Sequence, residues 1–418
     1  MSTTSMPSPE IAIVGLGAAG LMAAAVALRA GARVTVFEKN DRPGRKLAIT
    51  GKGRCNLTND CTVQEFFPNV ITNPRFLYSA ISRFSPADTM AFFEGLGVPL
   101  KTERGGRVFP VSDRAADVVE ALAREVRAAH RVQAEVTAIR REENGFCLTA
   151  GGRDYTAERV ILATGGASYP RTGSDGGGFR LARALGHTVT PLFPSLVPLA
   201  SKDPDCQRMQ GLSLKNVALT VRDGAGKTVY EDFGEMLFTH FGLSGPMVLS
   251  ASTHLRLPSL EGYTAIIDLK PALDMQTLDT RLLTELSRGA NRALSNILLT
   301  LVPSTMVPVL TDRLGIAPTR KGNSITKGER QAIAKLLKGL AIPLSSLRPI
   351  EEAIVTAGGV SVKEVDPKTM ASRLVPDLYF AGEMLDLDAY TGGFNLQIAF
   401  ATAHLAAVSA SAPRKDEE

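Results

Sequence analysis

The stretch IAIVGLGAAG, near the N-terminus, constrains the fold more than any other part of the chain. An apolar strand pattern leads into three spaced glycines, and a helix of small residues follows. In such a unit Gly15 permits a tight turn, Gly17 lets a pyrophosphate approach the backbone, and Gly20 allows close helix–strand packing. A second strand pattern, RVTVFEK, places Glu38 about 20 residues further on, where a carboxylate can accept ribose hydroxyls. The pattern predicts a dinucleotide-binding βαβ unit.

Residues 11–30 are apolar for almost the ~20 residues that a membrane span needs. The segment before them has no Lys or Arg and contains Glu10, which does not fit a signal peptide. Because the glycines have a fixed spacing and a strand pattern follows directly, we interpret the stretch as a buried strand and helix. We expect no membrane association.

The length of 418 residues predicts two or three compact units. Apolar residues at 44% and charged residues at 21% are typical of a globular protein and exclude a disordered one. The net charge of +5 fits an anionic ligand but does not by itself indicate nucleic acid. The four cysteines have neither zinc-type spacing nor disulfide density, so we expect no metal site and a cytoplasmic location.

The chain after Glu38 favours FAD over a nicotinamide cofactor. A carboxylate at this position disfavours the 2′-phosphate of NADP. A nicotinamide domain usually continues with further βα units, but here a helix, with Ser112 or Asp113 as the expected N-cap, precedes three strand patterns. The turn-like residues Glu143, Asn144 and Gly145 separate strand patterns of this group. An antiparallel meander that closes on VILATGG is typical of flavoproteins, so we predict non-covalent FAD. The candidate contacts in this part are Val136, Thr164 and Gly165.

The loop ITGKGRCNLTND, residues 49–60, allows three interpretations. A phosphate-binding P-loop is excluded, because Lys46 stands where its first glycine should be and Gly53 replaces its hydroxyl residue. A redox dithiol is disfavoured, since five residues separate Cys55 from Cys61 and NLTND favours turns over a helix. The interpretation that we adopt is a wall of the flavin site. Its candidate residues are Gly53, Arg54, Cys55 and Asn56.

Seven motifs, two of them already described, occur in this order: GLGAAGLMAA, GKGRCNLTN, RVFPVSDRA, ATGGASYPRTGSDGGGF, FTHFGLSGPMVLSAS, VTAGGV and AGEMLDLDAYTGGFNLQIAFATAH. They resemble the BaiN/RdsA family of NAD(P)/FAD-dependent oxidoreductases, some members of which are named aminoacetone oxidases. The resemblance extends from about Ile11 to about Ala407. It implies a Rossmann-like FAD-binding domain of the two-dinucleotide-fold type, interrupted by a β-rich piece and a helical piece. Two departures, TGKGRCN for SGGGRCN and TGSDGGGF for TGSTGDGY, suggest a subfamily whose substrate differs.

The patterns beyond residue 190 agree with this α/β layout. Strand alternation surrounds a turn at Gly224–Gly226, and Thr326 and Glu329 have the spacing of a capping box. The apolar helix face that follows comprises Ile333, Leu336, Leu337 and Leu340. We predict the FAD-binding domain in residues 9–190 and 346–410, a β-rich insert in 191–275 and a helical insert in 276–345.

The returning chain is predicted to complete the flavin site. DLYFAGEML ends a strand at Gly382 and Glu383, where a carboxylate can accept a ribityl hydroxyl, as the resemblance also implies. A helix begins near Gly393, and Asn395 and Gln397 at its start are expected to reach the flavin ring; simple helix capping is the alternative. The remaining cofactor candidates are Ala18, Ala19, Lys39, Lys46, Asp386 and Leu396.

Two residues are candidates for catalysis. His240 is one of only five histidines, and an imidazole suits acid–base work near neutral pH; a structural histidine is the alternative. Tyr169, in ASYPRTG, could orient a substrate carboxylate or carbonyl; a packed bend is the alternative.

We predict an enzyme that moves a hydride between FAD and a small organic substrate, with the protein binding and tuning the flavin. NAD(P)H is a possible donor, but the chain has no second GxGxxG. A basic cluster could bind RNA, but it has no interleaved aromatic residues, so we interpret it as a solvated helix face and do not expect nucleic acid. The cluster comprises Arg320, Lys321, Lys327, Arg330, Lys335 and Lys338. An RNA-modifying flavoprotein and a redox sensor without its own substrate are the alternatives, and no oligomeric state is predicted.

Overall fold

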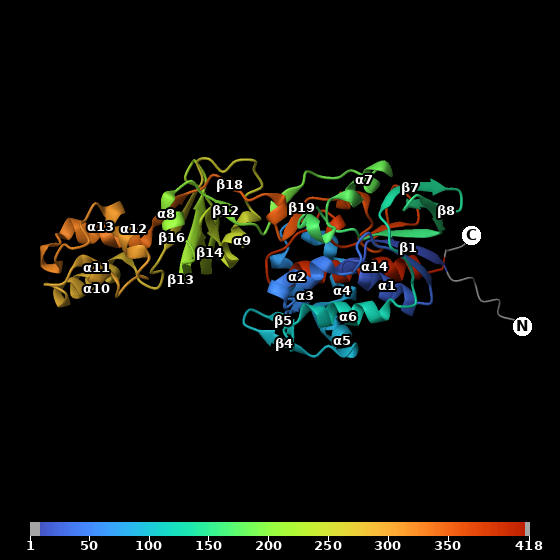
Figure 1. The fold of residues 1–418 in the computed structure, drawn as a ribbon, viewed down its shortest axis with the longest axis horizontal. Helices are drawn as coiled ribbons and strands as arrows, with labels where there is room; N and C mark the ends of the chain where they lie inside the picture. The colour runs from blue at the N-terminus through green and yellow to red at the C-terminus, as the bar shows by residue number, and fades with distance from the viewer. Residues whose placement is uncertain (1–8, 414–418) are drawn as a thin grey trace, which may run out of the picture. The chain divides into compact units, whose positions relative to one another are not determined.

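The computed structural model describes residues 9–413 of the chain. It contains two compact units (Figure 1). Unit 1 combines the chain up to Ser195 with the chain from Ile350 onward, and unit 2 comprises Leu196–Pro349. All of the cofactor residues predicted from the sequence fall in unit 1. The β-rich and helical segments together form unit 2 and share one hydrophobic core.

A five-stranded parallel sheet forms the centre of unit 1, in the order β20-β10-β1-β2-β6. Its strands are β1 (Glu10–Val14), β2 (Arg33–Phe37), β6 (His130–Val132), β10 (Arg159–Leu162) and β20 (Leu378–Phe380). The strands β1 and β10 are buried almost throughout, as expected where both faces of a parallel sheet are covered. The predicted α/β class with a Rossmann-like parallel sheet is therefore confirmed.

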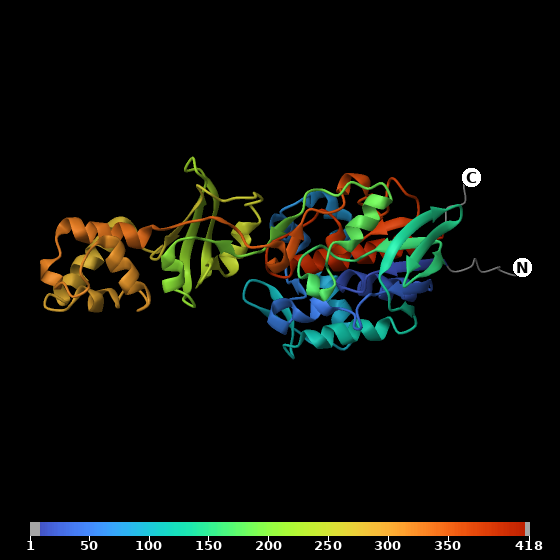
Figure 2. The same cartoon turned by 45° about the horizontal axis from the view of Figure 1, so that its top comes forward.

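Two helices, α1 (Ala18–Arg29) and α14 (Phe394–Ser411), pack against each other and against this sheet (Figures 1 and 2). Helix α14 is apolar around most of its circumference because α1, α4 and the sheet surround it. The other helices of unit 1 are α2 (Arg45–Gly53), α3 (Val63–Phe66), α4 (Tyr78–Arg83), α5 (Pro86–Gly95), α6 (Ala115–Glu125) and α7 (Gly177–Ala184). Within residues 9–413, no helix combines the length and the apolar character that crossing a membrane requires.

Three smaller sheets complete unit 1. The predicted meander is present as β7 (Val136–Glu142), β8 (Gly145–Ala150) and β9 (Arg153–Ala157), all antiparallel. Its first hairpin turns at Glu143 and Asn144, because Glu142 lies opposite Gly145, the first residue of β8. The other sheets consist of β3 (Thr58–Asn59), β5 (Arg107–Pro110) and β4 (Leu100–Glu103), and of β11 (Phe193–Ser195) with β19 (Val355–Ala357).

The expected N-cap of α6 is wrong. The helix begins at Ala115, its N-cap is Arg114, and no side chain caps it. Asp113 has a left-handed backbone, with φ = +55°, and its carboxylate binds Arg54 and Lys101 instead. The Asp113 side chain, which the local pattern predicted as a helix cap, therefore makes a tertiary contact instead.

Unit 2 is built on a seven-stranded sheet, in the order β17-β16-β13-β14-β15-β12-β18. Its strands are β12 (Leu199–Ala200), β13 (Ser213–Arg222), β14 (Thr228–Thr239), β15 (Gly242–Ser244), β16 (Thr264–Asp268), β17 (Leu340–Pro343) and β18 (Ser346–Leu347). Its helices are α8 (Pro204–Arg208), α9 (Pro246–Ser252), α10 (Met275–Arg288), α11 (Leu294–Leu298), α12 (Met306–Leu314) and α13 (Lys327–Lys338). The turn predicted at Gly224–Gly226 joins the antiparallel strands β13 and β14.

Helix α13 begins as its sequence predicts. The Thr326 side chain accepts the Glu329 N–H, and the Glu329 carboxylate accepts the Thr326 N–H, so the capping box is confirmed. Ile333 and Leu337 are buried on its inner face. Leu340 is buried too, but it belongs to β17, because the helix already ends at Lys338.

Candidate functional site

The turn between β1 and α1 assigns a different role to each glycine. Gly15 has φ = +94°, and a Cβ there would lie 2.7 Å from the carbonyl oxygen of Ala163. At Gly20 a Cβ would lie 1.8 Å from the carbonyl oxygen of Gly15, so the helix packs directly on the strand. At Gly17 a Cβ would meet nothing within 4 Å. Protein packing requires two of the glycines, and the third faces open space.

Helix α1 begins at this open space. Gly17 is its N-cap, and no side chain caps the first turn. The N–H groups of Ala18, Ala19 and Gly20 have no partner within the helix, and they carry the positive end of its dipole. Open space in front of such an uncapped N-terminus fits a pyrophosphate.

Glu38 lies beside the turn with its carboxylate fixed in place. The residue is 7% exposed. Its Oε2 accepts the Leu16 N–H at 2.9 Å, and its Oε1 accepts the backbone N–H of Asn40 at 2.9 Å and the side-chain amide at 2.7 Å. These donors hold an acceptor at the end of β2, the position expected for a ribose contact. The neighbouring Lys39 is ion-paired with Asp175, with 2.7 Å between Nζ and Oδ2.

Residues 50–56 form a loop with an unusual backbone, which includes the non-helical residues 50–52 near the end of α2. Lys52 and Cys55 have φ of +59° and +61°. Gly51 and Gly53 are also left-handed. Non-glycine residues in this region carry strain, which persists only where the surroundings fix it. The Oδ1 atom of Asn56 is buried and has no hydrogen-bond partner among the described residues. An unpartnered acceptor on this loop fits a donor group of a ligand.

Arg54 anchors the same loop. Its guanidinium pairs with Glu103 and with Asp113, the latter at 2.7 Å from Nε to Oδ1, and lies 4.2 Å from the centre of the Phe109 ring. The hydrogen bond from Arg54 lowers the pKa of Glu103, and those from Lys101 and Arg54 lower the pKa of Asp113. We name this group the Arg54 clamp. Because the side chain is engaged in it, direct contact of Arg54 with FAD stays a prediction.

The two cysteines of the loop are free thiols. Cys55 is fully buried, and burial raises the pKa of its thiol to about 12. Cys61 is half-buried, and burial together with the neighbouring Glu65 raises the pKa of its thiol to about 11. Neither thiol is poised to form the reactive thiolate on which disulfide exchange depends.

A polar network joins four distant segments of unit 1. The Nζ atom of Lys46 donates to Ser168 Oγ at 2.7 Å and to Glu383 Oε2 at 2.8 Å. Glu383 Oε1 accepts from Ser168 Oγ at 3.0 Å and from the Thr356 N–H at 2.7 Å. Two of the predicted residues, Lys46 and Glu383, are therefore in direct contact. Sequence reasoning missed Ser168 and Thr356, although both lie in motifs that carry the resemblance, ATGGASYPRTG and VTAGGV.

The segment after β10 holds more of the predicted residues. Thr164 Oγ1 lies 2.8 Å from the sulfur of Met384. Gly165 has φ = +79°, and a Cβ there would lie 3.1 Å from Ser174 Oγ, a buried atom without a partner among the described residues. Tyr169 is left-handed at φ = +54°, which is rare for an aromatic residue and typical of functional bends. Val136 lies at the start of β7 and is buried.

At the start of α14 the polar side chains bind other parts of the protein, whereas the first backbone N–H groups are left without helical partners. Gly393 is its N-cap, with φ = +99°, and no side chain caps the helix. The Asn395 amide binds the carbonyl of Ala389 at 2.8 Å, and Gln397 accepts from Thr58 Oγ1 at 2.7 Å. The first backbone N–H groups, at positions 394–396, are left without helical partners, so this N-terminus, which includes Leu396, fits an electron-rich group of a ligand.

The side-chain oxygen, the side-chain nitrogen and the backbone N–H of Gln397 all make hydrogen bonds within the protein. Its Oε1 also accepts from Thr89 Oγ1 at 2.7 Å, its Nε2 donates to the carbonyl of Phe84 at 2.8 Å, and its backbone N–H binds the Gly393 carbonyl. We do not propose it as a flavin ligand. Asp386 is half-buried, and its carbonyl accepts from the Asn73 amide at 2.8 Å, so a cofactor role for its side chain stays a prediction.

His240 belongs to unit 2. It occupies the turn between β14 and β15, is exposed, and has its ring edge-on to Phe241 at 5.0 Å between centres. No further contact of this imidazole indicates a catalytic role, and its acid–base role stays a prediction.

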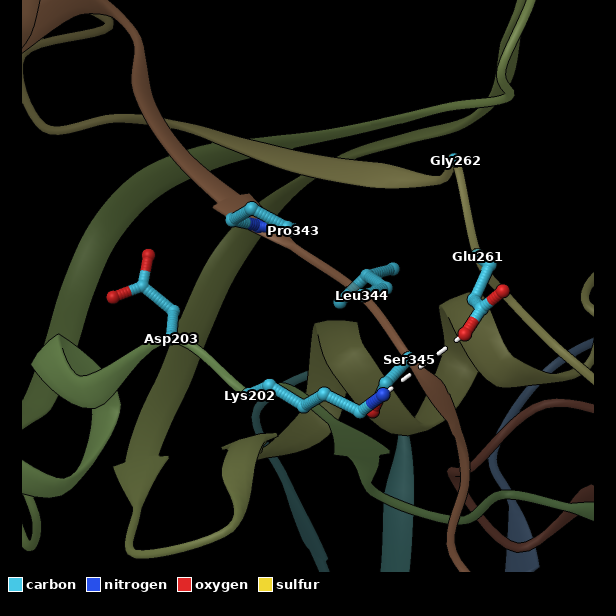
Figure 3. Close-up of a pocket in the computed structure, with 7 residues that line it drawn as sticks. All are labelled: Lys202, Asp203, Glu261, Gly262, Pro343, Leu344 and Ser345. Atoms are coloured by element: carbon cyan, nitrogen blue, oxygen red, sulfur yellow. Dashed lines mark ion pairs between the residues drawn. The ribbon is translucent and has the colours of Figure 1, made fainter.

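Unit 2 also contains a pocket of about 410 Å³ (Figure 3). Lys202 and Glu261 face each other across its edge, with 3.9 Å between Nζ and Oε1, and both side chains are largely exposed. The remaining lining residues are Asp203, Gly262, Pro343, Leu344 and Ser345. None of the site residues predicted from the sequence lines this pocket. The described residues contain no group of three or more His, Cys, Asp or Glu side chains placed to hold a metal ion.

The glycine turn, the fixed carboxylate at the end of β2 and the returning strand β20 define an α/β protein of the dinucleotide-binding class. The family described as HI0933-like protein Rossmann domain matches residues 9–409. The chain belongs to this family, and it is a flavoprotein oxidoreductase. The resemblance to BaiN/RdsA proteins is thereby confirmed.

The chain is similar to two curated relatives over nearly its whole length. A 3-dehydro-bile acid delta(4,6)-reductase from Clostridium scindens is 33% identical over 412 residues, covering 96% of this chain and 99% of the relative. A ribosomal RNA dihydrouridine synthase from Escherichia coli is 32% identical over 397 residues, covering 94% of this chain and 95% of the relative. A solved 3-ketosteroid-delta4-(5alpha)-dehydrogenase from Rhodococcus jostii RHA1 covers 99% of each chain at 15% identity, with a TM-score of 0.47, which is too distant to carry an argument.

Proposed function

We propose that this chain binds FAD non-covalently and reduces a carbon–carbon double bond conjugated to a carbonyl group in a small organic substrate. The observation that carries the proposal is the β1–α1 turn, where Gly17 leaves open space at an uncapped helix N-terminus. Bound FAD, once reduced by a two-electron donor, would supply the hydride, while the protein contributes binding, orientation and electrostatics.

The substrate class is supported by the names of the two relatives. A 3-dehydro bile acid with delta(4,6) double bonds has those double bonds conjugated to its 3-oxo group. Dihydrouridine is uridine whose ring double bond, also conjugated to a carbonyl, has been reduced. Since each relative is about one-third identical to this chain, at 33% and 32%, we extend only the shared reaction type.

The residues of unit 1 fit FAD along its length. The N–H groups of Ala18 and Ala19 suit the pyrophosphate, because they lie at the positive end of α1. Glu38 suits the adenosine ribose, since its oxygens are already oriented by Leu16 and Asn40. An ionised acceptor makes hydrogen bonds that contribute about 1.5–3 kcal/mol each.

The flavin end is assigned to the Lys46–Glu383 network, the loop of Asn56 and the N-terminus of α14. Lys46 and Ser168 orient the carboxylate of Glu383, so that one of its oxygens can also accept a ribityl hydroxyl. The unpartnered Oδ1 of Asn56 suits an N–H of the ring. The dipole of α14 favours negative charge on the ring when it is reduced.

Reduction of a conjugated double bond also needs a proton at the carbon next to the carbonyl. Tyr169 is our candidate in unit 1, because it directly follows Ser168 of the Lys46–Glu383 network in the chain and has the left-handed backbone that often marks functional bends. His240, in unit 2, is the second candidate.

The experiment is a half-reaction. Purified enzyme with bound FAD is reduced anaerobically with dithionite and mixed with cyclohexenone or with a 3-oxo-4-ene steroid, and flavin reoxidation is followed at its visible absorbance. We expect reoxidation by at least one conjugated enone and a saturated ketone as product. Cyclohexanone, which lacks the double bond, is the matched control and should leave the flavin reduced. A colourless protein, or a flavin that every enone leaves reduced, would contradict the proposal.

A uridine of ribosomal RNA is the second candidate substrate. It is favoured by one observation besides the relative's name: exposed cations without acidic partners lie on the helical part of unit 2. The same half-reaction with uridine-containing RNA tests it.

A further inference from the structure

We propose that the helical part of unit 2 is a docking surface for the phosphate backbone of double-stranded RNA. The inference rests on the second candidate function and extends it by assigning where the RNA is held. Six exposed side chains define the surface, which we call the basic surface. They are Arg281, Arg288, Arg292, Lys321, Lys327 and Lys335.

The acids of this part of the chain are already engaged. Asp279 binds Arg330 at 2.8 Å, and Glu329 binds Arg320 at 2.5 Å. Asp312 is paired with Arg208 of α8 at 2.6 Å. Glu285, the fourth acid between Met275 and Lys338, accepts a hydrogen bond from Thr300 at 3.4 Å. Little negative charge is therefore left to neutralise the exposed cations.

The other cations of the same stretch are engaged in ion pairs. Arg313 binds Asp203 at 2.7 Å and Asp205 at 2.6 Å, and Lys338 binds Asp268 at 2.6 Å. By contrast, no acid within the described residues lies at ion-pair distance from any of the six cations of the basic surface. The sequence-based interpretation of one solvated face combined these two kinds of cation. The structure separates four structural cations from six free ones.

The six cations lie on connected elements. Arg281 and Arg288 are seven residues apart on α10 and share its exposed side, since Leu278, Leu282 and Leu286 occupy the buried side. At the end of α10, the Gly322 N–H binds the Arg292 carbonyl at 3.1 Å, next to the antiparallel bridge between Ala293 and Lys321. Arg288, Arg292 and Lys321 thus gather where α10 ends.

Helix α13 extends the surface. Lys327 and Lys335 are both exposed, and their spacing of eight residues places them roughly 80° apart around the helix. Helices α10 and α13 pack together, and the Arg330–Asp279 pair joins them. The charges therefore cover two packed helices and one loop, rather than a single helix face.

The composition selects the kind of nucleic acid. No Phe, Tyr or Trp occurs between residues 275 and 338, so the surface offers no platform for stacked bases of a single strand. Exposed hydroxyl and amide side chains lie among the cations, including Thr280, Thr284 and Gln331. Duplex RNA presents phosphates and 2′-hydroxyls rather than accessible base edges, which suits cations interspersed with neutral hydrogen-bonding groups. We therefore infer recognition of the backbone and not of the sequence.

The test measures binding of a fluorescein-labelled RNA duplex of about 20 base pairs to the flavin-loaded full-length protein by anisotropy, from about 50 to 200 mM KCl. Two triple variants divide the surface: Arg288→Gln with Arg292→Gln and Lys321→Gln, and Arg281→Gln with Lys327→Gln and Lys335→Gln. The control, Arg153→Gln with Arg183→Gln and Lys368→Gln, removes three exposed cations of unit 1. All substitutions are at exposed positions, and thermal melting confirms that the variants fold.

We expect each surface variant to weaken binding at least about tenfold and to lower the slope of log affinity against log salt by about three, one for each lost phosphate contact. The control should change this slope by less than the value expected for the loss of one phosphate contact. An equal effect of the control, or tighter binding of single-stranded RNA, duplex DNA or phosphatidylglycerol vesicles than of the RNA duplex, would overturn the docking surface.

Flavin content and enone reduction are measured on the same samples. A yellow, enone-reducing enzyme that does not bind the duplex contradicts the docking surface but leaves the reductase proposal in place. A protein that binds the duplex with the expected slope supports the docking surface, even if it reduces no uridine; that result contradicts the second candidate function alone.

Discussion

Gly17 is the residue at which protein packing and ligand binding can be separated. Its φ of −75° is open to any residue, and a Cβ meets no protein atom within 4 Å, so Gly17→Val should fold. A valine at the N-cap costs about 1 kcal/mol of helix stability. Because its branches would occupy the space in front of α1, we expect a folded but colourless protein, measured as flavin absorbance per chain.

Gly95→Val is the matched control for this substitution. Gly95 also has open space around its Cβ, but it lies on the exposed end of α5. We expect this variant to retain flavin. Full flavin occupancy in Gly17→Val would show that the turn does not hold the pyrophosphate.

Glu38 combines a structural and a binding role. Its carboxylate accepts hydrogen bonds from Leu16 and Asn40, so Glu38→Ala should lower both the melting temperature and the affinity for FAD. Glu38→Gln keeps one acceptor oxygen and should lose less stability than affinity, since a charged acceptor contributes about 1.5–3 kcal/mol per hydrogen bond. Isothermal titration of the apoprotein with FAD measures the affinity. Glu10→Gln, on the exposed start of β1, is the control, and equal FAD affinity in all variants would remove Glu38 from the site.

Cys55 and Cys61 should not store electrons. Their thiol pKa values, raised to about 12 and about 11, leave almost no thiolate at neutral pH. Anaerobic titration with dithionite should therefore consume two electrons per flavin in the wild type, in Cys55→Ser and in Cys61→Ser. Four electrons in the wild type, falling to two in either variant, would revive the dithiol interpretation.

At the scale of elements, the Arg54 clamp fixes the strained loop of residues 50–56, at the end of α2, to the β4–β5 region. The double variant Glu103→Gln with Asp113→Asn removes both acids while leaving Arg54 in place. Exposed ion pairs contribute little to global stability, so the melting temperature should change only slightly. We expect faster loss of flavin, followed by fluorescence after dilution, because Asn56 and its neighbours are no longer held in position.

Asp154→Asn is the control for the clamp, since it breaks an exposed pair with Arg140 on the meander. The clamp also has a defined pH range. Because the pKa values of Glu103 and Asp113 are lowered in the folded protein, its contribution is complete above the ordinary carboxyl pKa near 4 and is lost only as the pH falls through the lowered values. An unchanged rate of flavin loss in the double variant would limit the clamp to a surface role.

Local patterns and tertiary contacts explain which elements could be predicted. The capping box of α13 involves Thr326 and Glu329, which are near neighbours in sequence, and it was predicted correctly. The cap of α6 was not, because Asp113 is claimed by Arg54, 59 residues away. Gln397 likewise binds Thr58 across 339 residues, a contact that no spacing rule could indicate.

At the scale of the whole molecule, only the part of the parallel sheet that is continuous in sequence could be predicted from local patterns. The β1–α1–β2 unit is continuous in sequence, so its glycines and Glu38 were sufficient to predict it. Strand β20 pairs with β10 only after the whole of unit 2 has intervened. Its return to the sheet was inferred from resemblance to a family, whereas the role of Glu383 was inferred from its place at the end of a strand and from that resemblance. The contacts of Glu383 with Ser168 and Thr356 required the folded chain.

The arrangement of glycines also bears on the source of electrons. A dedicated nicotinamide domain requires a second glycine turn between a strand and a helix. Gly224–Gly226 instead forms the hairpin of β13 and β14, and the glycines at 173–178 run from the end of a 3₁₀ turn into the first residues of the short helix α7, with no strand directly before them. We therefore predict that NADH and NADPH reduce the flavin slowly and without saturation, because neither has a preformed site for its pyrophosphate.

Stopped-flow mixing of the oxidised enzyme with each nucleotide, followed at the flavin absorbance, tests this prediction. Dithionite, which needs no binding site, is the control and should reduce the flavin completely. Saturable reduction at roughly tens per second with roughly micromolar affinity would show that the nicotinamide binds without a glycine turn of its own. Both thresholds are on the order of typical enzyme constants. The slow result would instead assign the physiological electrons to an organic donor or to a partner protein.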